Sequence, residues 1–207
     1  MLKRALAEGR RAPGTAPAGT LRAFRAGRDG STTVEFALVI VPFLGLLGGI
    51  IQFVFIIWAG TNLDQSVQRA ARNLFTGGFQ NANVGITNQT TLLNNLRTAM
   101  CGSGANAAVT VFSCNSVKLN IATASSFASG SYASAYDSTT RAIRAGFDSY
   151  ACAKPGQIVV VTAAVALPTF FKLLNPGFTT MADGSYLLQS TAVFRTEPYQ
   201  TTGATAC

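Results

Sequence analysis

Histidine is absent from this 207-residue chain, and charged residues make up only 12% of it. The missing histidines remove the commonest general base and the commonest metal ligand of proteins. The four cysteines form no Cys-x-x-Cys pair, so zinc and thioredoxin-like sites are not indicated. The acids after residue 60 form no recognisable acid/base or metal motif; they are Asp64, Asp137, Asp148, Asp183 and Glu197. We therefore expect a protein that is not an enzyme and that holds no cofactor or metal.

The positive charge of the chain is unevenly distributed. The formal net charge is +8, of which +5 falls in residues 1–30 (seven bases, two acids) and +3 in residues 31–207 (nine bases, six acids). A nucleic-acid interface needs a basic patch interleaved with aromatic residues, and no such patch follows residue 30. We therefore expect no nucleic-acid partner. A basic segment ahead of an apolar one is instead typical of the cytoplasmic flank of a membrane helix.

A run of 24 residues, 36–59, carries no formal charge. As a helix it spans about 36 Å, enough to cross a hydrocarbon core of about 30 Å. Pro42 is tolerated in such a helix but is expected to bend it or to melt one turn. The basic leader predicts a cytoplasmic N-terminus, with the chain after Trp58 in the periplasm or outside the cell. The alternative is a secretory signal cleaved after Gly60, for which the run is too long.

Apolar residues continue at helical spacing beyond this run, at Leu63, Val67, Ala70 and Leu74. Gly77-Gly78 is a signal that ends a helix. The pattern predicts one helix over residues 33–75, apolar all round in its first half and amphipathic in its second. The membrane segment is therefore expected to be part of a longer helix.

Three blocks of the sequence resemble one family. Residues 30–43 read Gly-Ser-Thr-Thr-Val-Glu-Phe-Ala-Leu-Val-Ile-Val-Pro-Phe, residues 62–72 read Asn-Leu-Asp-Gln-Ser-Val-Gln-Arg-Ala-Ala-Arg, and residues 193–199 read Val-Phe-Arg-Thr-Glu-Pro-Tyr. They resemble the opening, the post-membrane helix and a C-terminal signature of the TadE family. This family belongs to tight-adherence (Flp-type) pilus biogenesis and to the pseudopilin or minor pilin class of type IV pilin-like proteins. The resemblance is strongest over residues 30–76.

The resemblance implies a processing site and a set of partners. A prepilin peptidase would cut after Gly30 on the cytoplasmic face of the bacterial inner membrane, so that Ser31 becomes the first residue and Glu35 the fifth. The other implied partners are pilin-like subunits and the pilus assembly platform. The Glu35 carboxylate, four residues along the helix, can meet the new amine of Ser31 or of a neighbouring subunit, which lowers the cost of both charges near hydrocarbon. The alternative is an acid near a helix start that reaches the headgroups.

Four cysteines after a membrane segment suit disulfides in an oxidising compartment. Cys101 and Cys114 are 13 residues apart, and a bridge between them would tie the end of a helix to a strand pair. This placement is similar to that in the TadE family. Two reduced, buried thiols are the alternative. Cys152 and Cys207 are the remaining candidates for a second pair, and Cys207, the last residue, would otherwise be free.

The residues after the long helix predict a small α+β head. Helices are expected over 91–100, where Gly102 follows as a stop, and over 141–150. The expected strands are 109–112, 117–121, 157–167 and 185–195, the last two as antiparallel partners. Loops are expected over 79–91 and 122–140, and Ser131–Tyr136 also suits an adaptable contact surface.

Two further features leave alternatives open. An apolar patch between the two long strands suits core packing, or contact with a partner or a membrane surface; it comprises Phe170, Phe171, Leu173, Leu174 and Phe178. Arg195 and Glu197 are expected either to share a cross-strand or subunit ion pair or to form a solvated surface pair.

Together these patterns predict an α+β protein of three parts. They are a basic cytoplasmic leader (1–30), a membrane helix with an amphipathic extension (31–76) and a disulfide-tied periplasmic head (77–207). The resemblance implies a pilin-like minor subunit that acts by helix packing and either enters the filament or assists its assembly. One alternative is an unprocessed, single-pass scaffold or binding module of a secretion machine. Another is a domain released by signal peptidase.

Overall fold

The computed structural model describes residues 31–102, 108, 110–170 and 181–200. The chain divides into two compact units, Met1–Leu46 and Leu47–Cys207. We use "head" for the described residues from Gly77 to Gln200. Its short helices and antiparallel sheet, together with the long helix before it, confirm the predicted α+β class.

Helix α2, Ser31–Phe75, is 45 residues long. It remains helical at Pro42, so the melted turn is wrong, and the alternative of a bend stays a prediction. A membrane-type apolar helix tolerates this proline, because the helix still makes its other backbone hydrogen bonds within the segment. Its last turns carry a buried stripe at intervals of three and four residues, formed by Ile56, Ala59, Leu63, Val67, Ala70 and Leu74. This stripe confirms the predicted amphipathic extension.

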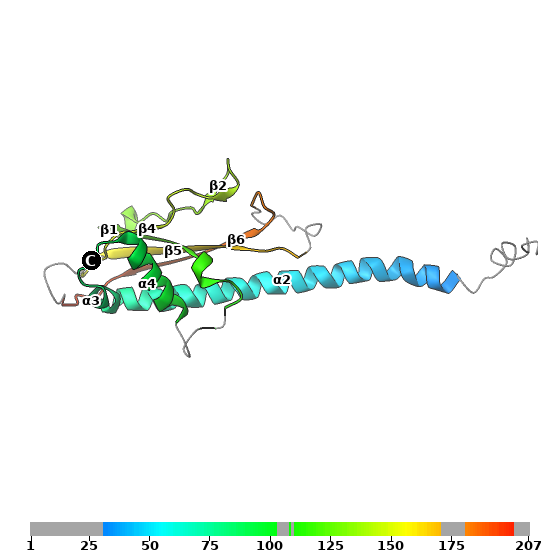
Figure 1. Cartoon of the computed structure of the whole chain (residues 1–207), viewed down its shortest axis with the longest axis horizontal. Coiled ribbons are helices and arrows are strands. Elements are labelled where there is room, and N and C mark those ends of the chain that lie inside the picture. Colours follow the sequence, from blue (N-terminus) through cyan, green and yellow to red (C-terminus); the bar gives the residue numbers. More distant parts are fainter. Residues whose placement is uncertain (1–30, 103–107, 109, 171–180, 201–207) are drawn as a thin grey trace, which may run out of the picture. The chain divides into compact units, whose positions relative to one another are not determined.

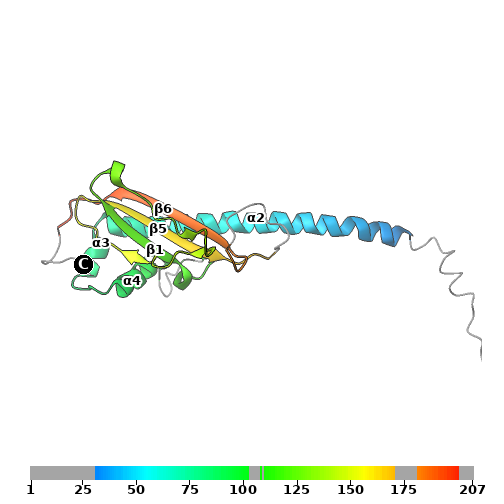
Figure 2. The same ribbon diagram turned by 90° about the horizontal axis from the view of Figure 1, so that it is seen from above.

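The head contains a four-stranded sheet in the order β4-β1-β5-β6 (Figures 1 and 2). Its strands are β1 (Lys118–Ala124), β4 (Ser149–Tyr150), β5 (Ile158–Leu167) and β6 (Tyr186–Arg195). β5 and β6 pair antiparallel over their full ten-residue length, as the two apolar runs predicted. β1 is antiparallel to β5 and parallel to β4. The longest predicted strands thus form the centre and one edge of the sheet.

Two helices pack on one face of this sheet: residues 56–75 of α2, and α4, Gln89–Cys101 (Figure 1). Asn88 is the N-cap of α4, and its side-chain oxygen accepts from the backbone N–H groups of Thr90 and Thr91 at 2.9 and 3.2 Å. The helix ends at Gly102, as predicted. The odd-numbered side chains of β5 from Val159 to Val165 join both helices in the main core. Burial of these apolar faces accounts for the attachment of α2 to the head.

The opposite face of the sheet is partly covered by the segment before β4 (Figure 1). It contains the hairpin of β2 (Tyr136–Asp137) and β3 (Ala142–Ile143), and Ala135 and Phe147 pack on Ala164 of β5. The helix predicted over 141–150 is therefore wrong, since those residues form β3, a turn and β4. The loop predicted over 122–140 is wrong in part, because β1 extends to Ala124 and a 3₁₀ turn occupies Phe127–Ser129.

Two further boundaries differ from expectation. The loop predicted over 79–91 contains α3, Gly78–Ala82, and its last residues begin α4. Residues 110–112 are not a strand, and Cys114–Ser116 forms a 3₁₀ turn, η3, ahead of β1. The packing of the buried Phe79 and Phe112 in the head sets the positions of these short elements. Their own sequences therefore show little hydrophobic periodicity.

Candidate functional site

The first half of α2 presents an exposed apolar surface over most of its circumference, with Gly48 and Gln52 as its buried residues. Phe36, Leu38 and Val41 are 65%, 74% and 70% exposed. Among the described residues, α2 is the one helix long and apolar enough to cross a membrane, with a mean hydropathy of 2.5 over its most apolar window. Only 17% of that window is buried within the structure, so this surface lacks the cover that a core helix has.

The predicted processing residues lie at the start of α2. Ser31 is its first residue, and Glu35 lies four residues along it, a spacing at which side chains lie on one face of a helix. Gly30 and the leader, residues 1–29, lie outside the described residues. The cleavage after Gly30 and the charge role of Glu35 therefore stay predictions.

An aromatic group follows the apolar half of the helix. Phe55 contacts the edges of Trp58 and Phe170, with ring centroids 6.4 and 5.5 Å away. Trp58 is 54% exposed and Phe170 is 65% exposed, so core packing is not the role of Phe170. Phe171, Leu173, Leu174 and Phe178, the other members of the predicted patch, lie outside the described residues. Exposed aromatic rings next to an apolar helix suit the interface of a membrane with water.

A disulfide joins Cys101 to Cys114, with their Cα atoms 6.4 Å apart. It ties the last residue of α4 to η3, where a strand pair had been expected. A loop of this length stabilises the head by about 3 kcal/mol in the chain-entropy account. Cys152 is also disulfide-bonded. Its predicted pairing with Cys207 stays a prediction, because Cys207 lies outside the described residues.

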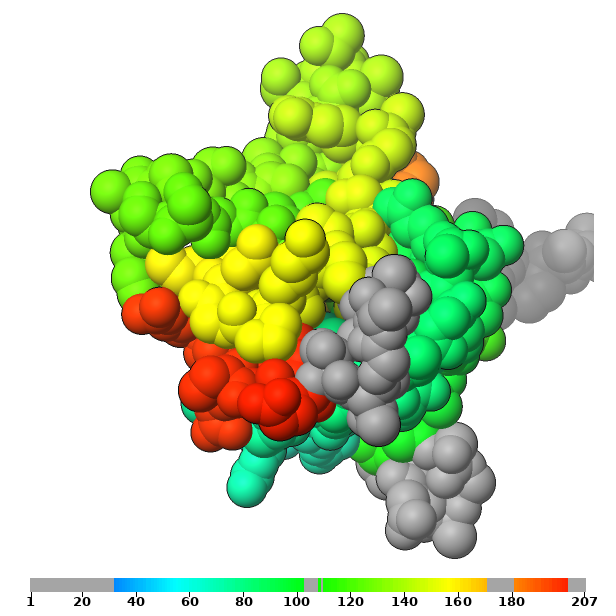
Figure 3. Space-filling view, turned by 90° about the vertical axis from the view of Figure 1, so that its left-hand side faces the viewer, coloured from blue at the N-terminus to red at the C-terminus, as the bar shows by residue number. Residues whose placement is uncertain are grey.

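The C-terminal signature fastens the end of α2 to the sheet. The buried Thr196 hydroxyl donates to the carbonyl of Lys154 at 2.7 Å, and the Glu197 N–H donates to the Phe75 carbonyl at 3.0 Å. The Tyr199 hydroxyl donates to the Ala153 carbonyl at 2.7 Å. Figure 3 shows this segment (red) between the residues around 150 (yellow) and the end of α2 (cyan). The signature is therefore structural.

Arg195 and Glu197 do not share an ion pair among those found in the described residues. The Arg195 Nε donates instead to the Gly156 carbonyl at 2.9 Å. A pair between these two side chains within the described part of the chain is thus not formed, and a pair across subunits stays a prediction.

Sequence reasoning missed a charged cluster centred on Asp148. One carboxylate oxygen accepts from Arg97 Nη2 at 2.9 Å and from the Leu119 N–H at 2.7 Å, and the other accepts from Lys118 Nζ at 3.0 Å. Arg97 is only 11% exposed and also donates through Nε to the Val117 carbonyl at 2.7 Å. The cluster joins α4, β1 and the approach to β4. Residues so far apart in sequence leave no local pattern that predicts this cluster.

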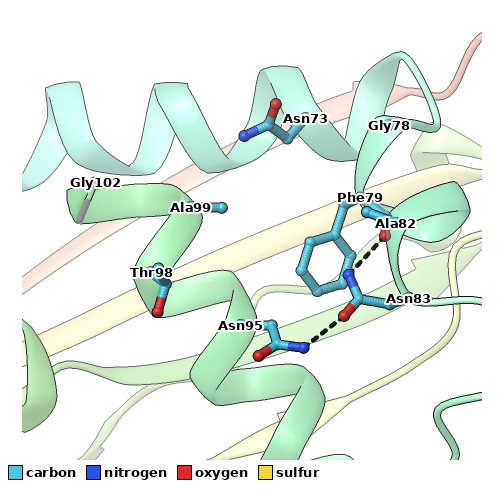
Figure 4. A pocket seen from close by; sticks show the side chains of 9 residues that line it. All are labelled: Asn73, Gly78, Phe79, Ala82, Asn83, Asn95, Thr98, Ala99 and Gly102. Carbon is cyan, nitrogen blue, oxygen red and sulfur yellow. Dashed lines mark hydrogen bonds between the residues drawn. The ribbon is translucent and has the colours of Figure 1, made fainter. Parts of the chain in front are cut away.

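A pocket of about 570 Å³ lies between the end of α2, α3 and α4 (Figure 4). Its lining residues are Asn73, Gly78, Phe79, Ala82, Asn83, Asn95, Thr98, Ala99 and Gly102. The Asn95 amide donates to Asn83 Oδ1 at 2.5 Å, and the Asn83 amide donates to the Phe79 carbonyl at 2.7 Å. Amides and a hydroxyl can hydrogen-bond a neutral ligand, but they supply no general acid or base near pH 7.

The pKa values that are shifted in the head have structural causes. Burial raises the pKa of the Tyr150 hydroxyl well above its ordinary 10.0, and nearby Tyr199 adds to the effect. A hydrogen bond from the Thr139 N–H lowers the pKa of Asp137, and hydrogen bonds from Thr140 lower this pKa further. Asp137 thereby caps a turn. Within the described ranges no cluster of three or more histidine, cysteine, aspartate or glutamate side chains is arranged to hold a metal ion. These groups hold local structure and form no constellation for proton transfer.

Comparison with known proteins links the long helix to a family. The family model TadE, described as TadE-like protein, matches residues 30–72. No curated protein and no solved structure matches the chain. The matched segment starts at the predicted cleavage glycine and ends in the last turn of α2, so it covers both the exposed apolar half and most of the buried stripe. The chain is thus similar to TadE-like proteins over residues 30–72, a segment that includes most of α2 and leaves the head unmatched.

Proposed function

We propose that this protein is a pilin-like minor subunit of a tight-adherence (Flp-type) pilus. It is made as a precursor in the bacterial inner membrane, and a prepilin peptidase removes residues 1–30. The basic leader lies in the cytoplasm, α2 crosses the membrane, and the head faces the periplasm. The subunit acts by packing its helix against other pilin-like helices and carries no catalytic step.

The observation that carries the proposal is the two-part character of α2. Residues 34–47 expose mostly apolar side chains, and from Gly48 the same continuous helix carries a buried stripe. A soluble protein rarely exposes so large an apolar surface. A helix that is free at one end and built into a domain at the other suits lateral packing in a membrane or in the core of a filament.

The role proposed for Glu35 follows from the chemistry of cleavage. Cutting after Gly30 gives Ser31 an α-ammonium close to hydrocarbon, where an unpaired charge is costly. A carboxylate four residues along the helix, or on a neighbouring subunit, compensates that charge. Glu35 is thereby a positioning charge for assembly.

Fractionation with intact-mass measurement tests the proposal in a host that makes the pilus. The proposal expects a membrane-bound species consisting of residues 31–207, part of which copurifies with sheared pili. A membrane-bound chain of full length would instead support the unprocessed scaffold of a secretion machine. A soluble species beginning at Thr61 would support release by signal peptidase, and either of these results overturns the proposal.

A further inference from the structure

The outer edge of the sheet is a long strand with one side open. β6 pairs with β5 in an unbroken register from Tyr186 to Arg195, and among the described residues no other strand pairs with it. Figure 2 shows β6 at the margin of the sheet. Proteins commonly protect such edges with proline, charged side chains, bulges or short length, and among these β6 has only one charged side chain, Arg195 at its last position.

The backbone of β6 directs alternate groups toward this open side. The Thr196 N–H donates to the Gln157 carbonyl at 2.9 Å, which makes the pair Gln157 and Thr196 a hydrogen-bonded one. Because such pairs alternate along an antiparallel ladder, the odd-numbered residues of β6 turn their N–H and C=O groups away from β5. The edge from Leu187 to Arg195 can therefore accept a further strand.

A groove of about 480 Å³ runs beside this edge, between α2 and β6. It is lined by Gln68, Arg69, Ala71, Arg72, Phe75 and Phe194. The rings of Phe75 and Phe194 meet edge to face with centroids 6.2 Å apart, which gives the groove an apolar part. Arg69 and Arg72 are exposed, and within the described part of the chain no carboxylate pairs with either of them.

We propose that this edge and groove bind an extended, acidic and apolar segment of a different envelope protein, which adds to the sheet as a strand beside β6. Its backbone hydrogen-bonds to the outward groups of β6. On the α2 side of the sheet, the side chains of the added strand lie beside the even-numbered residues of β6. There a carboxylate contacts Arg69 and Arg72, and an apolar group contacts Phe194.

A second copy of this chain does not fit the site. β6 itself contains no acid, and neither do residues 103–107, 171–180 or 201–207. Asp137 is the one acid in the described strands, and its strand β2 is already paired with β3. Glu8 and Asp29 lie in the leader, which the proposed function places in the cytoplasm, and the other described acids lie in α2 or between and after the strands of the folded head, so the complementary charge comes from another protein.

Peptide binding to the purified full-length chain in detergent micelles tests the proposal. The probe is a fluorescent peptide of about ten residues in which every second position is threonine and the positions between alternate glutamate with valine, so that both kinds of side chain lie on one face; its ends are blocked and binding is read by anisotropy. Its two controls are the same peptide with lysine in place of glutamate, and the glutamate peptide N-methylated at every second residue. The glutamate peptide is expected to bind at least about tenfold more tightly than either control.

Matched variants then locate the site. Arg69→Gln with Arg72→Gln is expected to weaken binding about tenfold, whereas Arg144→Gln with Lys154→Gln, which removes two exposed charges elsewhere, changes it less than about twofold. Equal binding of the lysine or the N-methylated peptide overturns the proposal, as does an equal effect of the two double variants. The proposal rests on the proposed function only in placing the head outside the cytoplasm. Peptide binding is measured on the uncleaved chain. A failure of peptide binding therefore does not contradict the proposed processing, and a failure of processing leaves the binding result intact.

Discussion

Tyr199 lies directly against Gly77, so closely that a Cβ atom on residue 77 would overlap the Tyr199 ring. Gly77 follows the end of α2 with a φ of 74°, a conformation that glycine adopts without the cost paid by other residues. Tyr199 is held in turn by its hydrogen bond to the Ala153 carbonyl. The turn after the long helix and the C-terminal signature thus depend on each other.

Gly77→Ala is expected to lower the free energy of unfolding of the head by about 2–5 kcal/mol, from left-handed backbone strain and overpacking together. The measurement is urea denaturation of the full chain in detergent, followed by near-ultraviolet circular dichroism. Gly85→Ala is the matched control, because Gly85 also has a positive φ of 80° but no atom within 4 Å of the added Cβ. Its loss is expected to be about 1–2 kcal/mol. Equal losses for the two variants would show that the Tyr199 contact is unimportant.

The Asp148 cluster predicts an unequal effect of removing its two basic partners. Arg97→Met leaves a partly buried carboxylate without its main partner and is expected to cost about 2 kcal/mol or more. Lys118 is 46% exposed, so Lys118→Met is expected to cost less than about 1 kcal/mol. The same denaturation measurement checks both, with Asp64→Asn on the exposed side of α2 as a neutral surface control. A larger loss for Lys118→Met than for Arg97→Met contradicts this account.

Tyr150 predicts how stability depends on alkaline pH. Its pKa in the folded head lies above the ordinary 10.0 because burial disfavours the phenolate. Below pH 10 both folded and unfolded chains keep the proton, and the contribution of Tyr150 is fully present. Above pH 10 the unfolded chain loses the proton first, so stability falls as pH rises, by up to about 1.4 kcal/mol per pH unit.

The check is the slope of unfolding free energy against pH from about pH 9 to about pH 11. Tyr150→Phe is expected to flatten that slope, whereas Tyr132→Phe, on a side chain that is 67% exposed, leaves it unchanged. Identical slopes for the wild type and Tyr150→Phe contradict the buried-phenol explanation. Because the slope is compared, any change in stability at neutral pH does not affect the conclusion.

Glu35→Gln is expected to separate cleavage from assembly. The substitution lies beyond the proposed scissile bond, so the chain is still cut, but the new amine of Ser31 loses its counter-charge. If that pair contributes about 1.4 kcal/mol, copurification with sheared pili falls about tenfold. Quantitative mass spectrometry of the pilus fraction measures this, with Asp64→Asn as a control for loss of one carboxylate. Normal copurification of the Glu35→Gln chain removes the proposed role.

The elements predicted well are those whose own sequence carries a strong pattern. The apolar period of α2 and the long β-branched run of β5 identify these elements without reference to the rest of the chain. The TadE-like opening at residues 30–43 similarly carries its own signal and falls within the family match. The site residues proposed at the helix start, Gly30, Ser31 and Glu35, come from that signal, and their roles stay predictions.

The elements predicted poorly are those set by distant contacts. β3 and β4 have two residues each, and their positions follow from Ala135 and Phe147 packing on β5 and from the hydrogen bonds of Asp148. The groove beside β6 requires residues 68–75 and 194 to come together. Such a site has no pattern along the chain, because its members belong to different elements.

The N-terminal residue of the membrane-bound chain tests the central claim most directly. Peptide mass spectrometry of the wild-type protein from a pilus-producing host is expected to find Ser31 as the first residue, and the full-length chain in a host that lacks the prepilin peptidase. Gly30→Glu is expected to block the cut, whereas Gly27→Glu, which adds the same charge within the leader, leaves it in place. An intact leader in the wild-type host, or unchanged cleavage of the Gly30→Glu chain, would contradict the account.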